Sequence, residues 1–482
     1  MRFSLKKKSG HGMHHVRPED RVPIGQKIAY GLGGPLEILS VTIPKSVITP
    51  VFNIGMGLNP VLISLVAMLW RAWDAFSDPV MGNISDNART RWGRRRPFIV
   101  LGAILTGLTM PIMWWAPESL SQWQLFTWLL VTGILFYTCF TIWSMPYYSL
   151  NMEMSPSYDE RTIITAYRAV PQKLAYLLAG WIIALASMSI FGVNADGTPN
   201  LINGMRWISL CLAGATIVLG VLPGIFVKER YYAKTKGQKK RRLMDDVKQT
   251  FRTKPFLILL TIVFTKLLGF GFIGTLGFYL NAYYVCGGDI KQAAVINGVK
   301  ASMLILPNLF AVPFCTWLSS CFGKRVVLYV ISASTILGFL SVYIFYDPAH
   351  PWLQLIPALL VSPLSAGIWL IAPSMQADVA DFDELETGNR REGSFSAVFS
   401  WTTKMTSTIT TGLGGFVLVW TGFDVAHGAE QPPHVLDNIM HCYVLIPVAF
   451  SAVNIVCVYF YSLTRERMED IRAQLEERRG AL

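Results

Sequence analysis

The chain contains little charge for its length. Of its 482 residues, 15% are charged and 52% are hydrophobic, and the mean hydropathy is +0.41. Soluble globular chains carry about 25% charged residues, so this composition excludes an ordinary soluble protein. It indicates instead a protein that lies within a membrane.

The motifs of several enzyme classes are also missing. The sequence has no Walker A motif, no nucleophile elbow and no HExxH motif, which disfavours an ATP-driven pump and a membrane hydrolase. Its seven cysteines form no CxxC and stand at no metal-ligand spacing with histidine. We therefore expect free, buried thiols, no catalytic residues, no cofactor and no structural metal.

Long apolar runs, by contrast, are abundant. A run of about 20 residues crosses a hydrocarbon core of about 30 Å. We expect twelve such runs, near residues 27–52, 58–81, 97–116, 124–150, 162–188, 204–227, 255–285, 292–320, 326–346, 352–377, 393–421 and 438–463. The first follows a long basic tail without a small-residue cleavage site, so no removable signal peptide is expected.

Basic residues gather in the connections that follow even-numbered runs. These hold Arg89, Arg91, Arg94–Arg96, Arg161, the basic residues between Lys228 and Lys254, Lys324, Arg325, Arg390 and Arg391. Because cytoplasmic loops carry the positive excess, both termini are expected in the cytoplasm. The same bias and the anionic lipids of the inner leaflet explain the formal net charge of +12 without a nucleic-acid partner.

The polar connection KERYYAKTKGQKKRRLMDDVKQTFRTK divides the chain into two halves. The expected organisation is a cytoplasmic tail (1–26), a six-helix bundle (27–227), a cytoplasmic linker (228–254), a second six-helix bundle (255–463) and a cytoplasmic tail (464–482). Two such bundles are typical of secondary transporters. We therefore predict an all-α membrane protein with twelve transmembrane helices in two six-helix bundles.

Few acidic side chains lie inside the runs, and a charge at mid-bilayer costs at least about 2.5–3.5 kcal/mol. Asp74 and Asp78 lie one helical turn apart, so their carboxylates share a face and can converge on one cation, including Na⁺. Arg71 lies one turn earlier on the same face. An Arg71–Asp74 ion pair that only holds helices together is the alternative.

The same run ends at the inner surface in a turn rich in arginine. Asp86, Gly93, Arg94 and Arg95 stand in it. The arginines can bind acids or helix C-termini at the ends of other runs. We assign these four residues to gating.

Several separated segments together resemble one transporter family. They are RAWDAFSDPVMG (71–82), TRWGRRRPF (90–98), FTIWSMPYYSL (140–150), Arg168, WLIAPSMQADVADFDELETGNRREG (369–393) and Lys404. In order and spacing they are similar to the glycoside–pentoside–hexuronide:cation symporters, the melibiose-permease branch of the major facilitator superfamily.

The resemblance implies roles for individual positions. Asp74 and Asp78 match residues that take part in Na⁺, Li⁺ or H⁺ binding, whereas Arg168, Trp369 and Lys404 match residues that line the sugar and cation cavity. The sequence also departs from the family pattern: an acidic residue is replaced by Ser144, a neighbouring tryptophan by Tyr148, and a lysine–aspartate pair by Glu37 and Ile38. Galactoside specificity is therefore not implied, and Ser144 favours proton coupling.

Basic residues within the runs outnumber the acids. They are Lys45, Arg71, Arg168, Lys173, Lys266, Lys300 and Lys404. Lys45 and Lys300 could reach the membrane interface by snorkelling, whereas Lys266 and Lys404 lie deep. An anionic sugar group would pair with Arg168, Lys266 or Lys404, unless Lys404 instead neutralises Asp74 or Asp78. Trp143, Tyr148 and Trp369 could stack on sugar rings.

These features predict a monomeric, cation-coupled symporter of a sugar, glycoside or hexuronide in the bacterial inner membrane. The coupling ion is H⁺ or Na⁺, bound near Asp74, Asp78 and Ser144, and membrane lipids surround the protein. One alternative is a transporter of amphipathic lipids, which a hydrophobic side opening between helices would favour. The other is a non-transporting membrane sensor, which would more often carry an appended soluble domain.

Overall fold

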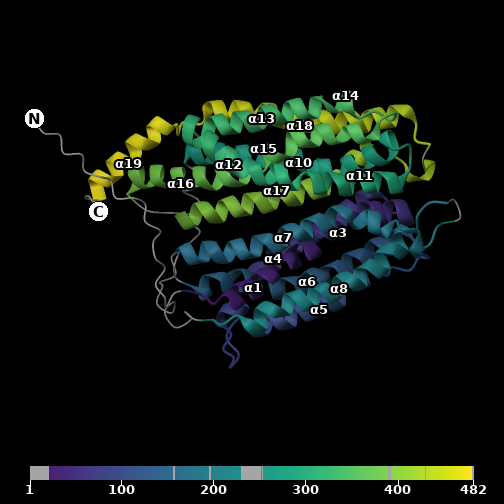
Figure 1. Cartoon of the computed structure of the whole chain (residues 1–482), viewed down its shortest axis with the longest axis horizontal. Helices are drawn as coiled ribbons and strands as arrows, with labels where there is room; N and C mark the ends of the chain where they lie inside the picture. Colours follow the sequence, from purple (N-terminus) through teal and green to yellow (C-terminus); the bar gives the residue numbers. More distant parts are fainter. Residues whose placement is uncertain are drawn as a thin grey trace, which may run out of the picture.

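The computed structural model describes residues 21–155, 158–194, 197–229, 251, 253–388, 392–428 and 430–479. Most of the expected cytoplasmic tail (1–26) and linker (228–254), and the residues Arg390 and Arg391, lie outside this part. Within it, long helices run side by side in two groups, one built from α1–α8 and the other from α10–α18 (Figure 1). The helix α19 lies at one end of the second group.

The first bundle follows the chain order of the expected runs. Its elements are α1 (Ile24–Leu32), α2 (Gly34–Glu37), η2 (Ile38–Thr42), α3 (Ile43–Thr49), η3 (Pro50–Ile54), α4 (Pro60–Asn87), α5 (Arg96–Trp114), α6 (Gln122–Met154), α7 (Tyr158–Ala186), the short η4 (Ser189–Phe191) and α8 (Leu201–Phe226).

The second bundle is divided into more helical elements than the first. Its elements are α10 (Lys254–Tyr279), η6 (Leu280–Val285), α11 (Ile290–Met303), α12 (Ile305–Phe322), α13 (Lys324–Leu340), α14 (Val342–Phe345), η7 (Pro351–Gln354), α15 (Leu355–Ser365), α16 (Ile368–Thr387), α17 (Glu392–Trp420), η8 (Val425–His427), α18 (Pro433–Phe460) and α19 (Arg465–Arg479).

Nine helical segments among the described residues are long and apolar enough to cross a membrane. Three more helical stretches, α1–η3, α4 and α17, stand where the sequence predicts runs but contain more polar or broken sequence. The all-α membrane fold is therefore confirmed, while the count of twelve crossings stays a prediction.

The first run is not one regular helix. It passes through two π-helical stretches, η2 and η3, and contains Pro35, Pro44 and Pro50. A proline lacks the backbone N–H that an α-helix needs and clashes with the preceding turn, and wide π turns absorb that disruption. Lys45 lies directly after Pro44, so the break sets the direction of its side chain.

The two bundles contact each other mainly at the end away from α19. The hydroxyl of Tyr279 donates to Asn53 Oδ1 at 2.6 Å, and the backbone N–H of Gly415 donates to Ser64 Oγ at 2.7 Å. One apolar core runs from the first bundle into this end of the second, whereas a separate core packs α19 through Ile471 onto the other end. The interface is thus closed at one end of the molecule.

The prediction of buried thiols is correct for Cys139 and Cys315 and wrong for Cys211 and Cys321, which are exposed. All seven cysteines are free. Both exposed cysteines lie on helices that are apolar on most sides, and such a helix can turn a small side chain outward toward lipid.

Candidate functional site

Asp74 and Asp78 of α4 each pair with a different cation. Arg71 Nη1 lies 3.2 Å from Asp74 Oδ2 within the first bundle. Lys404 Nζ, from α17 of the second bundle, lies 3.3 Å from Asp78 Oδ2. The Arg71–Asp74 pair considered as an alternative is therefore present, and beside it a second pair joins the two bundles.

Asp78 also has oxygen neighbours on α6. Thr141 Oγ1 donates to Asp78 Oδ1 at 3.2 Å and lies 3.2 Å from Ser77 Oγ. Asp74 Oδ1 is buried and has no hydrogen-bond partner among the described residues. Carboxylate and hydroxyl oxygens are ligands that hard cations prefer, so this place can hold a small cation or a proton.

Arg168 belongs to a separate cluster inside the first bundle. Its guanidinium is paired with Glu37, and Gln172 Nε2 donates to the same carboxylate oxygen at 3.1 Å. The guanidinium carbon also lies 5.0 Å from the ring centroid of Tyr148. Sequence reasoning did not assign Glu37 to the site; its signal was that it is one of only three acids within the runs.

Trp143 and Ser144 face the interior of the first bundle. Trp143 is fully buried, donates from Nε1 to the carbonyl of Gly220 at 3.0 Å and stacks on Tyr147 with centroids 4.4 Å apart. These contacts give Trp143 a packing role between α6 and α8, and its assignment to substrate binding stays a prediction. Ser144 is buried with no hydroxyl partner in the described part of the chain, and no contact joins it to Asp74 or Asp78.

Lys266 lies within the second bundle. It is 4% exposed, donates from Nζ to Thr335 Oγ1 at 2.6 Å and lies 4.6 Å from the ring centroid of Phe270. The side chain therefore occupies the space between α10 and α13, and its assignment to substrate binding stays a prediction. Trp369, near the start of α16, is 58% exposed and stays a substrate-binding prediction.

The four residues assigned to gating come together at the α19 end of the first bundle. Arg95 Nη2 lies 2.9 Å from Asp86 Oδ1 and 3.2 Å from Glu153 Oε1, and Arg94 pairs with the same two acids. Glu153 follows the apolar part of α6; burial raises the pKa of its carboxyl, and Arg95 and Arg94 oppose that shift. These ion pairs connect the ends of α4 and α6.

Glu229, just after α8, completes this cluster. Its carboxylate accepts from the backbone N–H groups of Arg94, Arg95 and Arg96 at 2.8, 2.8 and 3.2 Å. Gly93 has a φ of +109°, and a Cβ there would meet Glu229 Oε1 at 2.7 Å. Sequence reasoning missed Glu229 because it is a single acid at the start of a basic linker.

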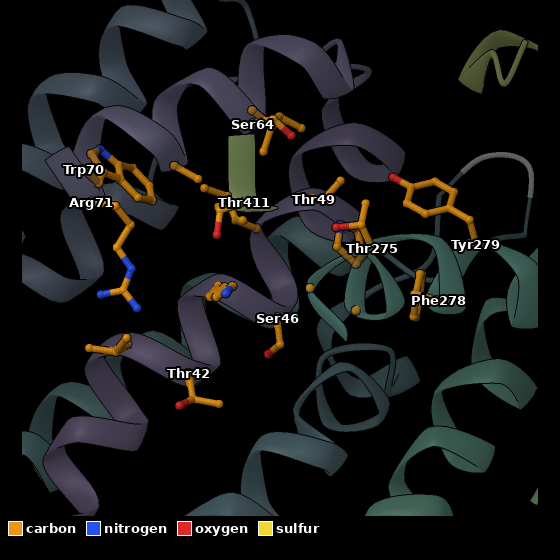
Figure 2. A pocket seen from close by; sticks show the side chains of 18 of the residues that line it. Thr42, Ser46, Thr49, Ser64, Trp70, Arg71, Thr275, Phe278, Tyr279 and Thr411 are labelled. Atoms are coloured by element: carbon orange, nitrogen blue, oxygen red, sulfur yellow. The ribbon is translucent and has the colours of Figure 1, made fainter. Parts of the chain in front are cut away.

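A cavity of about 220 Å³ lies between the bundles (Figure 2). The first bundle contributes residues of η2, α3 and α4, and the second contributes residues of α10 and α17. Its hydroxyl-bearing residues include Thr42, Ser46, Thr49, Ser64, Thr275 and Thr411. Lys45 and Arg71 also line it. The structure thus brings Arg71, Asp74, Asp78 and Lys404 to the bundle interface, next to a cavity whose largely apolar lining also carries these hydroxyl groups and two basic residues.

Three known proteins match this chain over nearly all of its length. The chain is 24% identical to an uncharacterized symporter of Synechocystis, with 94% of this chain and 96% of that protein covered. It is 23% identical to the sodium-dependent lysophosphatidylcholine symporter 1-B of Danio rerio, with 96% and 91% covered. It is 20% identical to the glucuronide carrier protein homolog of Escherichia coli, with 94% and 95% covered.

A solved structure and a family model place the fold. The structure is a bacterial homolog of the human lysosomal transporter Spinster, with a TM-score of 0.62 at 14% identity, covering 95% of this chain and 98% of that one. The family model, described as MFS/sugar transport protein, matches residues 29–465. The chain is therefore an integral membrane protein that belongs to this transporter family of the major facilitator superfamily, as its melibiose-permease-like segments predicted.

Proposed function

We propose that this protein is a cation-coupled symporter that carries a sugar or glycoside by alternating access. The observation that carries the proposal is the ion pair between Asp78 of one bundle and Lys404 of the other. It places a titratable, cation-binding group where the two bundles meet. Occupancy by an ion and the relative position of the bundles then depend on each other.

The coupling step follows from charge balance at this pair. In the described arrangement, Lys404 neutralises Asp78. A bound proton or Na⁺ takes over that role and releases the ammonium group, so the contact between α4 and α17 weakens. Because an unmatched charge in a low-dielectric interior is costly, the bundles exchange partners only when the ion is present.

For the coupling ion we propose a proton. We retain proton coupling as the expectation, because Ser144 supplies no third carboxylate. The oxygens of Ser77, Asp78 and Thr141 are also ligands that Na⁺ accepts. A Na⁺ gradient at constant pH that drives full accumulation would replace H⁺ by Na⁺ in the proposal.

For the substrate we propose a site that includes Arg168, Tyr148 and Trp369. The Arg168–Glu37 pair offers donors and acceptors to sugar hydroxyls, and aromatic faces pack on sugar C–H surfaces. The names of two relatives, a glucuronide carrier homolog and a glycoside/cation symporter, support a sugar or glycoside.

We also propose the orientation and the domain division. Residues 27–227 and 255–463 form the two moving bundles, the α19 end faces the cytoplasm because its connections are basic, and the protein acts as a monomer in a bacterial inner membrane. With this orientation, the Tyr279–Asn53 bond closes the outer side. The described arrangement is then inward-facing.

One observation favours the amphipathic-lipid alternative. A cavity of about 430 Å³ lies between α7 and the helices α10, α11, α13 and α15, and its lining is mostly apolar with Lys300 on one side. Lys300 Nζ donates to Gln354 Oε1 at 3.4 Å. An apolar space with one cation fits an amphiphile that carries a phosphate group, and a relative is named a lysophosphatidylcholine symporter.

Uptake into proteoliposomes tests the proposal. A panel of labelled sugars and glycosides, with lysophosphatidylcholine as the lipid arm, is supplied with or without imposed Na⁺ and pH gradients. Gradient-driven accumulation of a sugar supports the proposal. Accumulation of the lipid alone would favour the alternative, and transport of every substrate at the same rate without a gradient would contradict coupling.

A further inference from the structure

The interbundle cavity of Figure 2 carries unbalanced charge. Two basic residues, Lys45 and Arg71, line it, and its lining includes no Asp or Glu. Arg71 is already paired with Asp74. Lys45 forms no ion pair with any residue that the structure describes, and the other charged residue of the lining, Arg71, has the same sign.

Local structure directs Lys45 into this cavity. It occupies the first turn of α3, directly after Pro44 and the wide turns of η2. Its side chain is exposed, although its neighbours Ile43 and Val47 are fully buried. The cavity wall around Lys45 also includes residues of the first apolar core, such as Ile48 and Ile63, which offer the ammonium group no hydrogen-bond acceptor on their side chains. A cation in this position lacks a counter-ion and favours an anionic partner.

The surrounding side chains suit a small polyhydroxylated molecule. The first bundle contributes Thr42, Ser46, Thr49 and Ser64, and the second contributes Thr275 and Thr411. Hydroxyl groups both donate and accept hydrogen bonds, as sugar hydroxyls require. Pockets for drug-sized ligands are about 300–1,000 Å³, so a cavity of about 220 Å³ is suited to a single sugar unit.

Other cations considered for this task already have partners. Arg168 is paired with Glu37, Lys404 with Asp78, and Lys266 lies inside the second bundle on Thr335. An incoming anion would have to displace a carboxylate from Arg168 or Lys404. Lys45 needs no such exchange.

Building on the sugar symport proposed above, we propose that Lys45 binds the anionic group of an acidic sugar and makes the transporter specific for acidic over neutral sugars. The group is a carboxylate or a sulfate ester, since both offer several oxygens to one ammonium. This subsite is additional to the one proposed above at Arg168, Tyr148 and Trp369. Hydroxyl groups of both bundles hold the acidic sugar unit in it, so that unit bridges the two halves that must move.

The test is binding to the purified full-length protein, measured by isothermal titration calorimetry. The probes are D-glucuronate, D-glucose 6-sulfate, their neutral parent D-glucose, and the galacto epimers of all three. The variants are Lys45→Gln, which removes the charge, and Lys45→Arg, which keeps it. Lys291→Gln is the matched control, because Lys291 is an exposed lysine at the start of α11.

The expected result is a preference of at least about tenfold for an acidic sugar over its neutral parent in the wild-type protein. Lys45→Gln should erase that preference, while Lys45→Arg and Lys291→Gln retain it. The carboxylate and sulfate arms show which anion is preferred.

Two outcomes would overturn the inference and leave sugar symport standing. One is equal affinity of the wild-type protein for acidic and neutral sugars. The other is a Lys45→Gln variant that loses affinity for both kinds of sugar to the same degree. A wild-type protein that binds none of the sugars, but accumulates lysophosphatidylcholine in the uptake assay, would overturn the proposed function together with this inference.

Discussion

At the residue scale, Asp74 and Asp78 are chemically alike but have different partners. The partner of Asp74 is Arg71 on the same helix, whereas that of Asp78 is Lys404 across the interface. Neutralising Asp74 therefore disturbs one bundle. Neutralising Asp78 removes a contact between the two bundles, which in the proposed mechanism forms and breaks as they move, so we expect the larger effect there.

The first prediction concerns this difference. Asp78→Asn should abolish uphill accumulation and leave substrate exchange without a gradient, because a neutral amide cannot balance a coupling cation. Asp74→Asn should do the same more weakly. Gradient-driven uptake and counterflow in proteoliposomes measure the two activities, with Asp437→Asn, an exposed site on α18, as the control. Unchanged uphill uptake in both variants would remove the carboxylates from the mechanism.

The second prediction concerns Trp143. Its indole donates to the Gly220 carbonyl within the packed first bundle, so Trp143→Phe should lower stability by about 1 kcal/mol, the net worth of one hydrogen bond. Substrate affinity should stay within about twofold of wild type, a difference well below the 1.4 kcal/mol that a tenfold change requires. Thermal unfolding in detergent and equilibrium binding measure the two quantities. A large loss of affinity at unchanged stability would instead support the assignment of Trp143 to the substrate site.

At the scale of elements, the turn before α5 joins three helix ends of the first bundle. The turn binds Glu229 through backbone N–H groups, and its arginines bind Asp86 at the end of α4 and Glu153 at the end of α6. All of these partners belong to the same bundle. The cluster therefore stiffens the α19 end of the first bundle. A bundle that moves as one rigid body requires such stiffness.

The third prediction follows for this turn. Replacing both Arg94 and Arg95 by Gln should slow transport with little change in substrate affinity, because the ion pairs lie at the helix ends, away from the interbundle cavity. Initial uptake rates and equilibrium binding distinguish the two effects. Glu229→Gln should act in the same direction through the lost carboxylate. A large loss of affinity at equilibrium would contradict this role.

The sequence predicted where these helices lie along the chain better than it predicted where each of them is broken. Hydropathy located the run at 27–52, but not its division into α, π and α segments, because the wide turns depend on how three prolines pack against other helices. In contrast, the four-residue spacing of Asp74 and Asp78 was sufficient to place both on one face. The spacing of residues along the sequence thus predicts which side chains share one face of a helix.

At the scale of the whole molecule, the partners of buried cations could not be predicted from sequence. The depth of Lys266 within its run was estimated from the number of residues, yet its direction, toward α13 rather than the interface, depends on how α10 packs. Lys45 was considered for snorkelling to the membrane surface, and the structure places it on an internal cavity. Pairing across bundles, as in Lys404 with Asp78, needs the three-dimensional arrangement.

The last prediction concerns closure of the bundle interface. The Tyr279 hydroxyl donates to Asn53 Oδ1 at 2.6 Å and joins the bundles at the end away from α19. Tyr279→Phe removes that donor and keeps the ring, so it should shift the population toward an interface that is open at this end. One hydrogen bond of about 1 kcal/mol corresponds to about a fivefold change in the equilibrium.

Spin labels at positions 121 and 347, in the connections at that end of each bundle, would report the shift as a larger share of long distances in a cysteine-free background. Tyr283→Phe is the matched control, because its ring stacks on Tyr279 and its hydroxyl makes no hydrogen bond within the described residues. An unchanged distance distribution in Tyr279→Phe would mean that apolar packing between the bundles, as between Gly412 and Met68, maintains the closure without this bond. An equal shift in both variants would also contradict the prediction, because Tyr283→Phe leaves the bond between Tyr279 and Asn53 in place.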